Sequence, residues 1–464
     1  MGETDEVRFF EVPWHAQVGR LVNPELGLRS VALRGGENAP YDLDVTALDA
    51  PDHRLVRAGI WLAHRVLDGR GEWYLAAEGW EPHLPAETIQ QMGHADLPDE
   101  LADLVRPFRR GAALGPVAAL AYRREEYALR GPDTALVAVL RNEQVQIRTG
   151  GVTTARYRQL TLRGQHGRLT GRQVAWLTGT LSAVGAIRVA EFPSLAQRLG
   201  APATGLSDLP GPRSRSAEDS LESYVASLLT ARLRRLTQAD LAVRAGQPGA
   251  ASELMAELVA VRSHLLGLVP LLDPGWVGDL VGELEWASRF LSDHTELTAR
   301  PAELSGERYL RLLDRLVQAG RAPALGDSGT EPAGPVLTAT LRRRLRDLRL
   351  SLKGIRAEGP DLVWLQALQA AERLVDCCGV QADQVRAVKQ LRRRASRLAA
   401  ALADCLEAHH ERATIDLAPM TPQQAFEAGR AYERVAMAEH DARLDVIDEW
   451  PELERRLRRL GKEL

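Results

Sequence analysis

Short runs of apolar residues, separated by turn-forming residues, fill the first 200 positions of the chain. Several runs alternate with period two, as in 134–140 and 144–148, which places every second side chain on one face of a strand. The pattern predicts strands at 31–33, 59–62, 73–76, 135–140, 145–147 and 157–162, and helices at 98–105 and 171–182. We therefore expect residues 1–200 to form an α+β region built on a mostly antiparallel sheet.

After residue 217 the pattern changes to longer segments with apolar residues three and four positions apart, which is typical of amphipathic helices. Helices are predicted at 220–235, 251–268, 341–355, 364–375, 384–411 and 422–448. Residues 201–217 are rich in Pro, Gly and Ser and are expected to form a linker. A second such stretch near 322–335 divides residues 218–464 in two, so we expect a duplicated all-α helical bundle.

Composition adds to this picture mainly by excluding classes of protein and kinds of site. The 464 residues are 45% apolar and 26% charged with a net charge of −3, and these totals give no indication of DNA or membrane binding. Cys377, Cys378 and Cys405 are too few for a disulfide framework. No signal-peptide pattern opens the sequence, which makes a cytoplasmic protein the expectation. A P-loop is excluded because Gly-Lys-Ser and Gly-Lys-Thr are both absent.

Residues 49–65 carry the most informative motif. They begin with Asp-Ala-Pro-Asp, continue through Leu55 and an Arg-Ala-Gly element, and end with Leu62 and Arg65. This stretch resembles the early core of the CYTH family, the triphosphate tunnel metalloenzymes. The family pattern there is Asp-Thr-Pro-Asp-x-x-Leu followed by a small-Gly-x-x-Leu-Arg-x-Arg strand. The first arginine of that strand is replaced by Ala63 here.

The CYTH resemblance implies a tunnel or barrel of antiparallel strands. Basic residues inside it hold a triphosphate, and carboxylates hold a divalent metal. By this resemblance Glu6 corresponds to a metal-binding glutamate, and Arg8, Arg65 and Arg123 are the expected phosphate-binding residues. One remaining carboxylate should bind Mg²⁺ or Mn²⁺ poorly, so no cofactor is expected unless the tunnel is active.

Residues 217–455 resemble the CHAD domain, which often follows a CYTH domain. Similar segments are Glu-Leu-Glu-Trp-Ala at 283–287 and Ala-Phe-Glu-Ala-Gly at 425–429. The resemblance implies a helical bundle that binds inorganic polyphosphate through His and Arg side chains aligned on a helix face. In the corresponding helix here, residues 252–262, only Arg262 remains of that basic stripe.

Two arginine-rich segments offer further phosphate-binding candidates. Spacings of three and four residues place Arg342, Arg346 and Arg349 on one helical face, and Arg393 with Arg397 on another. A metal site is not expected at the neighbouring histidines 409 and 410, because the glutamates beside them on the same helix supply too few ligands on one face.

The loss of charges at both sites predicts a bacterial pseudoenzyme. We expect a non-catalytic binding or scaffold protein that associates with inorganic polyphosphate, with polyphosphate granules, or with unidentified protein partners, and with neither DNA nor a membrane. The alternative is a metal-dependent triphosphatase, in which Glu6 binds the metal and Arg65 and Arg123 clamp the phosphates. A third possibility is a purely structural interaction module.

The alternatives differ in the number of carboxylates that face the tunnel. Catalysis by the family mechanism requires at least two of them. The sequence leaves open whether Glu72, Glu125 or Glu143, from strands without a motif match, turn into the cavity.

Overall fold

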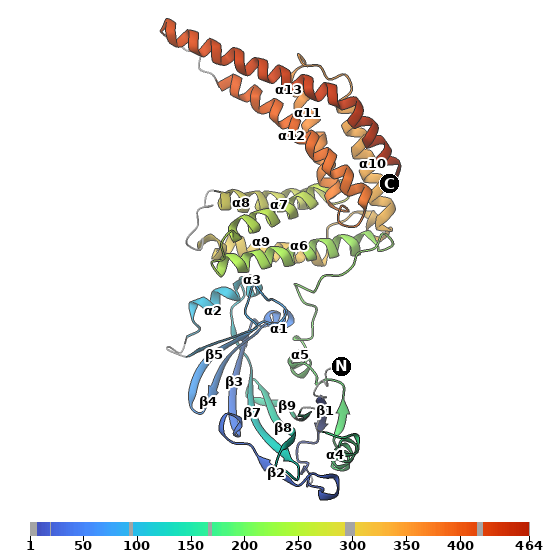
Figure 1. Cartoon of the computed structure of the whole chain (residues 1–464). Coiled ribbons are helices and arrows are strands. Elements are labelled where there is room, and N and C mark those ends of the chain that lie inside the picture. Colours follow the sequence, from blue (N-terminus) through green and yellow to red (C-terminus); the bar gives the residue numbers. More distant parts are fainter. Residues whose placement is uncertain are drawn as a thin grey trace. The chain divides into compact units, whose positions relative to one another are not determined.

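The computed structural model describes residues 7–18, 20–91, 96–165, 169–292, 302–414 and 421–463. The chain forms two compact units, residues 1–210 and 211–464 (Figure 1). An antiparallel sheet forms the first unit and helices form the second, which confirms the predicted order of sheet and helices. None of the helices in the described part of the chain has both the length and the apolarity that crossing a membrane requires.

Ten strands form one sheet in the described part of the first unit. They are β1 (Val7–Val12), β2 (Ser30–Leu33), β3 (Tyr41–Asp49), β4 (Trp61–Leu67), β5 (Arg70–Ala76), β6 (Glu87–Gln91), β7 (Gly115–Arg130), β8 (Leu136–Thr149), β9 (Val152–Gly164) and β10 (Ile187–Val189). The strand order is β10-β1-β9-β8-β7-β3-β4-β5-β6, with β2 paired to β7. Neighbouring strands are antiparallel throughout this order.

The expectation of a closed barrel is wrong for the described residues, because β6 and β10 end the sheet without pairing with each other. Strand β1 has no edge left for β6, since it pairs with β9 on one side and with β10 on the other. The sheet is therefore open.

Short helices accompany this sheet. They are α1 (Arg54–Arg57), α2 (Asp99–Leu104), α3 (Arg106–Arg109), α4 (Gly171–Ala183) and α5 (Leu195–Leu199), with 3₁₀ turns η1 (Pro24–Leu26) and η2 (Gly36–Asn38). Helix α4 begins with a capping box, in which the Thr170 and Gln173 side chains bind each other's backbone N–H groups.

Each face of the sheet carries its own apolar core. On one face Phe10 and Leu162 pack with Leu177 and Leu181 of α4, and we call this the α4 face. The opposite core contains residues of β3, β4, β7, β8 and β9, with Leu195 and its neighbours of α5 against it, and we call this the α5 face. Because side chains alternate along a strand, the register assigns every strand residue to one of the two faces.

The second unit is helical. Its elements are α6 (Leu221–Arg244), α7 (Ala250–Leu268), α8 (Pro274–Ser292), η3 (Ala302–Ser305), α9 (Glu307–Arg321), η4 (Asp327–Thr330), α10 (Ala333–Ser351), α11 (Asp361–Gly379), α12 (Arg386–Thr414) and α13 (Pro422–Glu463). Helix α11 packs on α7, α10 and α12, and α13 packs on α12 and α10. Helix α13 continues well beyond its predicted end at residue 448 and contains Pro451.

Gly267 permits the close contact between α7 and α11. A Cβ atom at this position would lie 2.4 Å from the carbonyl oxygen of Asp376, so Gly267→Ala must push the helices apart. Overpacking of this kind typically costs about 1–3 kcal/mol of unfolding free energy, which urea denaturation would measure. Gly278→Ala in α8 is the matched control, because open space surrounds that position, and it should leave stability unchanged or raise it.

His264 on α7 is expected to make the contact between α7 and α11 less stable at acidic pH. Its Nε2 lies 3.0 Å from the Gly379 carbonyl oxygen, and burial with the nearby Arg232 lowers its pKa from 6.5 to about 4. Between about pH 6.5 and about pH 4 the His264 side chain is therefore protonated in the unfolded chain and neutral in the folded chain. The free energy of unfolding falls as the pH drops through this range. The loss should reach about 3 kcal/mol across this window. Urea denaturation at a series of pH values should show a flatter profile for His264→Gln, and an unchanged profile would contradict this assignment.

Candidate functional site

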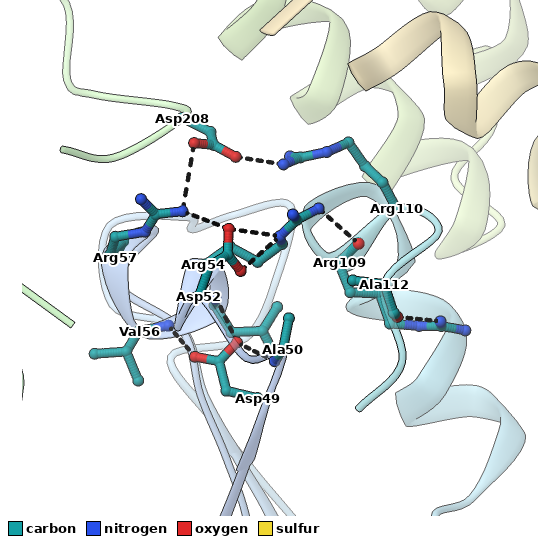
Figure 2. A network of polar contacts seen from close by, with 11 residues as sticks. Asp49, Ala50, Asp52, Arg54, Val56, Arg57, Arg109, Arg110, Ala112 and Asp208 are labelled. Carbon is teal, nitrogen blue, oxygen red and sulfur yellow. Dashed lines mark hydrogen bonds and ion pairs between the residues drawn. The ribbon is translucent and has the colours of Figure 1, made fainter. Parts of the chain in front are cut away.

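The motif at residues 49–65 forms the turn between β3 and β4. Asp49 ends β3 and accepts hydrogen bonds from the backbone N–H groups of Ala50, Leu55 and Val56 at 2.7, 3.0 and 3.0 Å (Figure 2). The carboxylate thereby satisfies donors at the start of α1. Burial raises the pKa of Asp49, and the three backbone donors oppose this shift. Its oxygens are directed at the backbone, so Asp49 has a structural role.

Two further carboxylates bind the arginines of the same turn. Asp52 accepts hydrogen bonds from Arg54 and Arg57, each at 2.9 Å. Asp208 pairs with Arg110 and lies 3.7 Å from Arg57 (Figure 2). These contacts hold the turn against the segment after α3 and against the end of the first unit. The motif therefore consists largely of residues that stabilise the fold.

Strand register separates the arginines that the motif alignment selects. Arg65 on β4 lies on the α5 face, whereas Arg8 on β1 pairs with Leu162 of the α4 face. Arg123 also lies on the α4 face, because it is three residues from Leu120 in the core of the α5 face. The structure does not bring these three arginines together. The expected metal ligand at position 6 lies outside the described residues.

Together with Arg65, the α5 face carries charged residues that the motif alignment does not contain. Three arginines there each contact at least one glutamate and a tyrosine ring, an arrangement that we call the Arg–Glu–Tyr sets. They are Arg65 with Glu72 and Tyr74, Arg124 with Glu143 and Tyr41, and Arg198 with Glu11 and Tyr157. The guanidinium carbons lie 3.8, 5.5 and 4.2 Å from the ring centroids in that order, which is within cation–π range.

The sets neutralise their own arginines. Nε of Arg65 donates to Glu72 at 2.9 Å, and Nε of Arg124 donates to Glu143 at 2.8 Å. Burial and a hydrogen bond to the additional carboxylate of Glu87 raise the pKa of Tyr74 to about 12. Beside its apolar core, the α5 face thus has a polar region that is lined with tyrosine and close to charge balance.

The sequence did not determine which face of the sheet Glu72, Glu125 and Glu143 occupy, and two of these glutamates lie on the α5 face. Glu72 and Glu143 share it with Arg65, while Glu125 lies on the other face next to Arg123. Among the described residues of the first unit, however, no three His, Cys, Asp or Glu side chains come close enough to hold one ion together. The two glutamates are bound to arginine, so a metal would have to displace those contacts.

The second unit distributes its candidate arginines over separate surfaces. Arg262 on α7 pairs with Glu285 of α8 at 2.8 Å. Arg393 is exposed on α12, and Arg397 lines a cavity beside the acidic residues Glu449 and Glu452 of α13. These three positions therefore do not form one anion site.

The remaining candidates do come together, in what we call the basic pocket. Arg342, Arg346 and Arg349 of α10 face the last turns of α13 across a cavity of about 600 Å³. The complete lining is Arg342, Leu345, Arg346, Arg349, Arg455, Arg458, Arg459, Gly461 and Lys462. Seven of these nine residues are cationic and none is acidic. Three of the seven, Arg349, Arg455 and Arg458, have a glutamate within 4.0 Å, so the pocket keeps an excess of positive charge.

Ion pairs inside the protein compensate only part of this charge. Arg349 donates to Glu454 at 2.9 Å, and Arg458 lies 3.7 Å from the same carboxylate. Within the described residues, Arg342 and Lys462 have no acidic partner within 4.0 Å, and the same holds for Arg346 and Arg459. The pocket thus presents cations that an anion can bind without first breaking an ion pair.

A second polar cluster joins α11, α12 and α13. His409 lies 3.2 Å from Asp361 and 3.5 Å from the buried Glu439. These three could supply metal ligands, but Arg412 and Arg443 already bind the same carboxylates. The sequence expectation of no metal site considered only residues on one helix, and these partners come from two others. Two arginines balance the two carboxylates, which favours a structural role.

The fold and the charges define a two-unit protein with a neutralised sheet face and a basic helical pocket. No protein-family model matches the chain. Two uncharacterized proteins of Mycobacterium tuberculosis, Rv2226 and MT2285, are each 26% identical over 380 residues, covering 76% of this chain and 67% of theirs.

Solved structures resemble part of the chain at low TM-scores. A candidate adenylate cyclase of Bacillus halodurans is 15% identical with a TM-score of 0.22, covering 36% of this chain and 94% of its own. The PH1819 protein of Pyrococcus horikoshii is 12% identical with a TM-score of 0.21, covering 40% and 92%. A candidate adenylyl cyclase of Hippeastrum, described with a dominant triphosphatase activity, is 10% identical with a TM-score of 0.20, covering 42% and 95%. Similarity at this level supports no inference about function.

Proposed function

We propose that this chain is a non-catalytic protein of the CYTH–CHAD type that binds inorganic polyphosphate in the basic pocket of its second unit. The observation that carries the proposal is the convergence of seven cationic side chains from α10 and α13 on one cavity with no acidic lining residue. Guanidinium groups bind phosphate oxygens through paired N–H donors, so an arginine-rich lining suits a phosphate ligand.

The position of the charge matters more than its total. Residues 216–464 contain 34 Lys and Arg against 37 Asp and Glu, so the second unit is not basic as a whole. Residues 342–353 contain six Lys and Arg and one Asp, and they lie opposite the arginines of 455–459. A local excess of this kind attracts a polyanion to one site, while the rest of the second unit is net acidic.

The proposal assigns the first unit a non-catalytic role. Its Arg–Glu–Tyr sets leave Arg65, Arg124 and Arg198 bound to carboxylates of the protein itself. A phosphate would have to compete with those carboxylates, and a metal would have to compete with the arginines. We therefore expect the α5 face to bind a metal–triphosphate complex weakly.

One observation favours the alternative, a metal-dependent triphosphatase. Glu72 and Glu143 share a face with Arg65 and Arg124, so the two carboxylates that the mechanism requires are present on one surface. Rearrangement of these pairs around Mg²⁺ or Mn²⁺ and a triphosphate would give the family arrangement.

Binding and hydrolysis distinguish the two functions. The full chain is titrated with fluorescently labelled long-chain polyphosphate at about 0.15 M salt, where exposed charges farther apart than about 8 Å are screened. The expected result is saturable binding that needs no metal and weakens steeply with added salt. Release of phosphate from tripolyphosphate in the presence of Mg²⁺ or Mn²⁺ would establish the alternative. Absence of polymer binding would overturn the proposal.

A further inference from the structure

The basic pocket continues into a second cavity of different chemistry, which we call the adjoining lobe. This lobe measures about 480 Å³ and is lined by Arg346, Arg349, Leu350, Lys353, Trp450, Glu454 and Arg458. Three of these residues, Arg346, Arg349 and Arg458, also line the basic pocket, so the two cavities meet along a shared row of arginines.

The adjoining lobe contains an apolar and an aromatic side chain, neither of which offers a hydrogen bond or a charge to inorganic phosphate. Leu350 is 68% exposed at its wall, although it is a large apolar side chain. Trp450 lines the lobe and is half-buried, because it also packs against the apolar core of α10–α13. A tryptophan fixed by the core offers a rigid aromatic surface at little cost in conformational entropy.

Glu454 marks the border between the cavities. Its carboxylate accepts a hydrogen bond from Arg349 and lies 3.7 Å from Arg458. A phosphate placed beside it would be repelled, whereas a hydroxyl or amino group could donate a hydrogen bond to it. The lobe therefore disfavours a continuous polyphosphate chain and favours a neutral group that carries hydrogen-bond donors.

We infer that the two cavities together bind a nucleoside polyphosphate, with its phosphates in the basic pocket and its base against Trp450. A ligand that satisfies both cavities carries several negative charges at one end, which the arginines neutralise. At the other end it carries an aromatic ring with hydroxyl or amino donors, which Trp450 and Glu454 accommodate. This inference rests on the proposed anion-binding function of the basic pocket and specifies the ligand class of that site.

Calorimetric titration of the full chain with two probes tests the inference. Adenosine triphosphate and inorganic tripolyphosphate contain the same phosphate chain and differ in the nucleoside. If phosphate contacts alone determine affinity, the two bind equally or tripolyphosphate binds more tightly, because it carries more charge. We expect adenosine triphosphate to bind at least about tenfold more tightly, the gain that one stacked base provides.

Substitutions separate the contribution of the base from that of the phosphates. Trp450→Leu should remove the preference for adenosine triphosphate and leave tripolyphosphate affinity unchanged. Trp286→Leu is the matched control, since Trp286 is a half-buried tryptophan on α8 that contacts Arg308 and does not line either cavity. Equal affinities for both probes, or an equal loss with Trp450→Leu, would overturn the inference.

A second variant covers the case in which Trp450→Leu fails to fold. Glu454→Gln should raise tripolyphosphate affinity and reduce the preference for adenosine triphosphate, because it removes both the repulsion and the strong acceptor. Glu433→Gln, an exposed position on the same helix, gives the same change in net charge. If long-chain polyphosphate binds and adenosine triphosphate does not, the inference fails and the proposed function stands. If neither binds, both fail.

Discussion

The double substitution Arg346→Glu with Arg458→Glu should weaken binding of long-chain polyphosphate by about a hundredfold or more. Both arginines line the basic pocket and the adjoining lobe, so the change reverses the charge where the cavities meet. Hydrogen bonds to charged groups contribute about 1.5–3 kcal/mol each, and losing two of them accounts for a factor of this size. Fluorescence anisotropy at constant salt concentration measures the effect.

The control for this experiment changes the net charge equally on other surfaces of the second unit. Arg311 on α9 and Arg430 on α13 are exposed and line neither cavity. Arg311→Glu with Arg430→Glu should reduce affinity only slightly, as a general electrostatic effect. Equal losses in the two double variants would show that polyphosphate binds by net charge and not at the pocket.

The substitution Asp240→Ala should cost about 3–5 kcal/mol of unfolding free energy, the cost of removing one partner of a buried ion pair. Asp240 and Arg244 lie on α6 with 0% and 2% of their side chains exposed, and Nε of Arg244 donates to Asp240 at 2.8 Å. Tyr309 of α9 also donates to Asp240, at 3.2 Å. The substitution leaves a buried guanidinium without this carboxylate. Urea denaturation followed by circular dichroism reports the loss.

Two further variants test the cause of that loss. Glu307→Ala removes the acidic partner of Arg311 on α9, an exposed pair 3.8 Å apart, and should change stability by at most about 0.5 kcal/mol. Replacing Asp240 with Leu and Arg244 with Met together should recover much of the stability, because no buried charge remains. A loss in the double variant as large as in Asp240→Ala would mean that packing, and not charge, determines the cost.

The sequence predicted elements well where periodicity and burial agree. Helices α4, α7 and α12 lie within three residues of their predicted bounds, and the predicted strand 157–162 lies inside the longer β9. The predicted strands 135–140 and 145–147 are one strand, β8, because the polar residues between them, among them Asn142, stay in register with β7 and β9. Helix α8 was not among the helices predicted from periodicity, although its buried residues Val277, Leu280, Leu284, Ala287 and Leu291 are spaced three and four apart.

The candidate site was harder to predict, because a motif does not determine which face of a sheet a residue occupies. Moving a side chain by one position along a strand transfers it to the opposite face. The alignment grouped Arg65 with Arg8 and Arg123, and the register separates them. Reading the pairing of Arg124 with Glu143 from sequence alone would have required the register of β7 against β8.

The arginines of α13 were missed for a different reason. The predicted helix 422–448 ends before Pro451, and a proline inside a helix removes a backbone hydrogen bond and usually ends the helix. In the structure α13 continues to Glu463, and this extension carries Arg455, Arg458 and Arg459 into the basic pocket. A longer predicted helix would have shown a second basic helical segment at 455–459, but its position opposite 342–349 depends on the packing of α13 on α10.

The Arg–Glu–Tyr sets imply that the α5 face of the first unit binds phosphate chains less readily than unpaired arginines would. A phosphate chain that approached the α5 face would meet Glu11, Glu72 and Glu143 beside the arginines that it needs. If the arginines bound a phosphate chain instead, the three carboxylates would lose their ion-pair partners in partly desolvated positions. That loss costs binding free energy, and the cost increases with each arginine that is displaced. Under the proposed function, we therefore expect the α5 face to bind a phosphate chain more weakly than the basic pocket does.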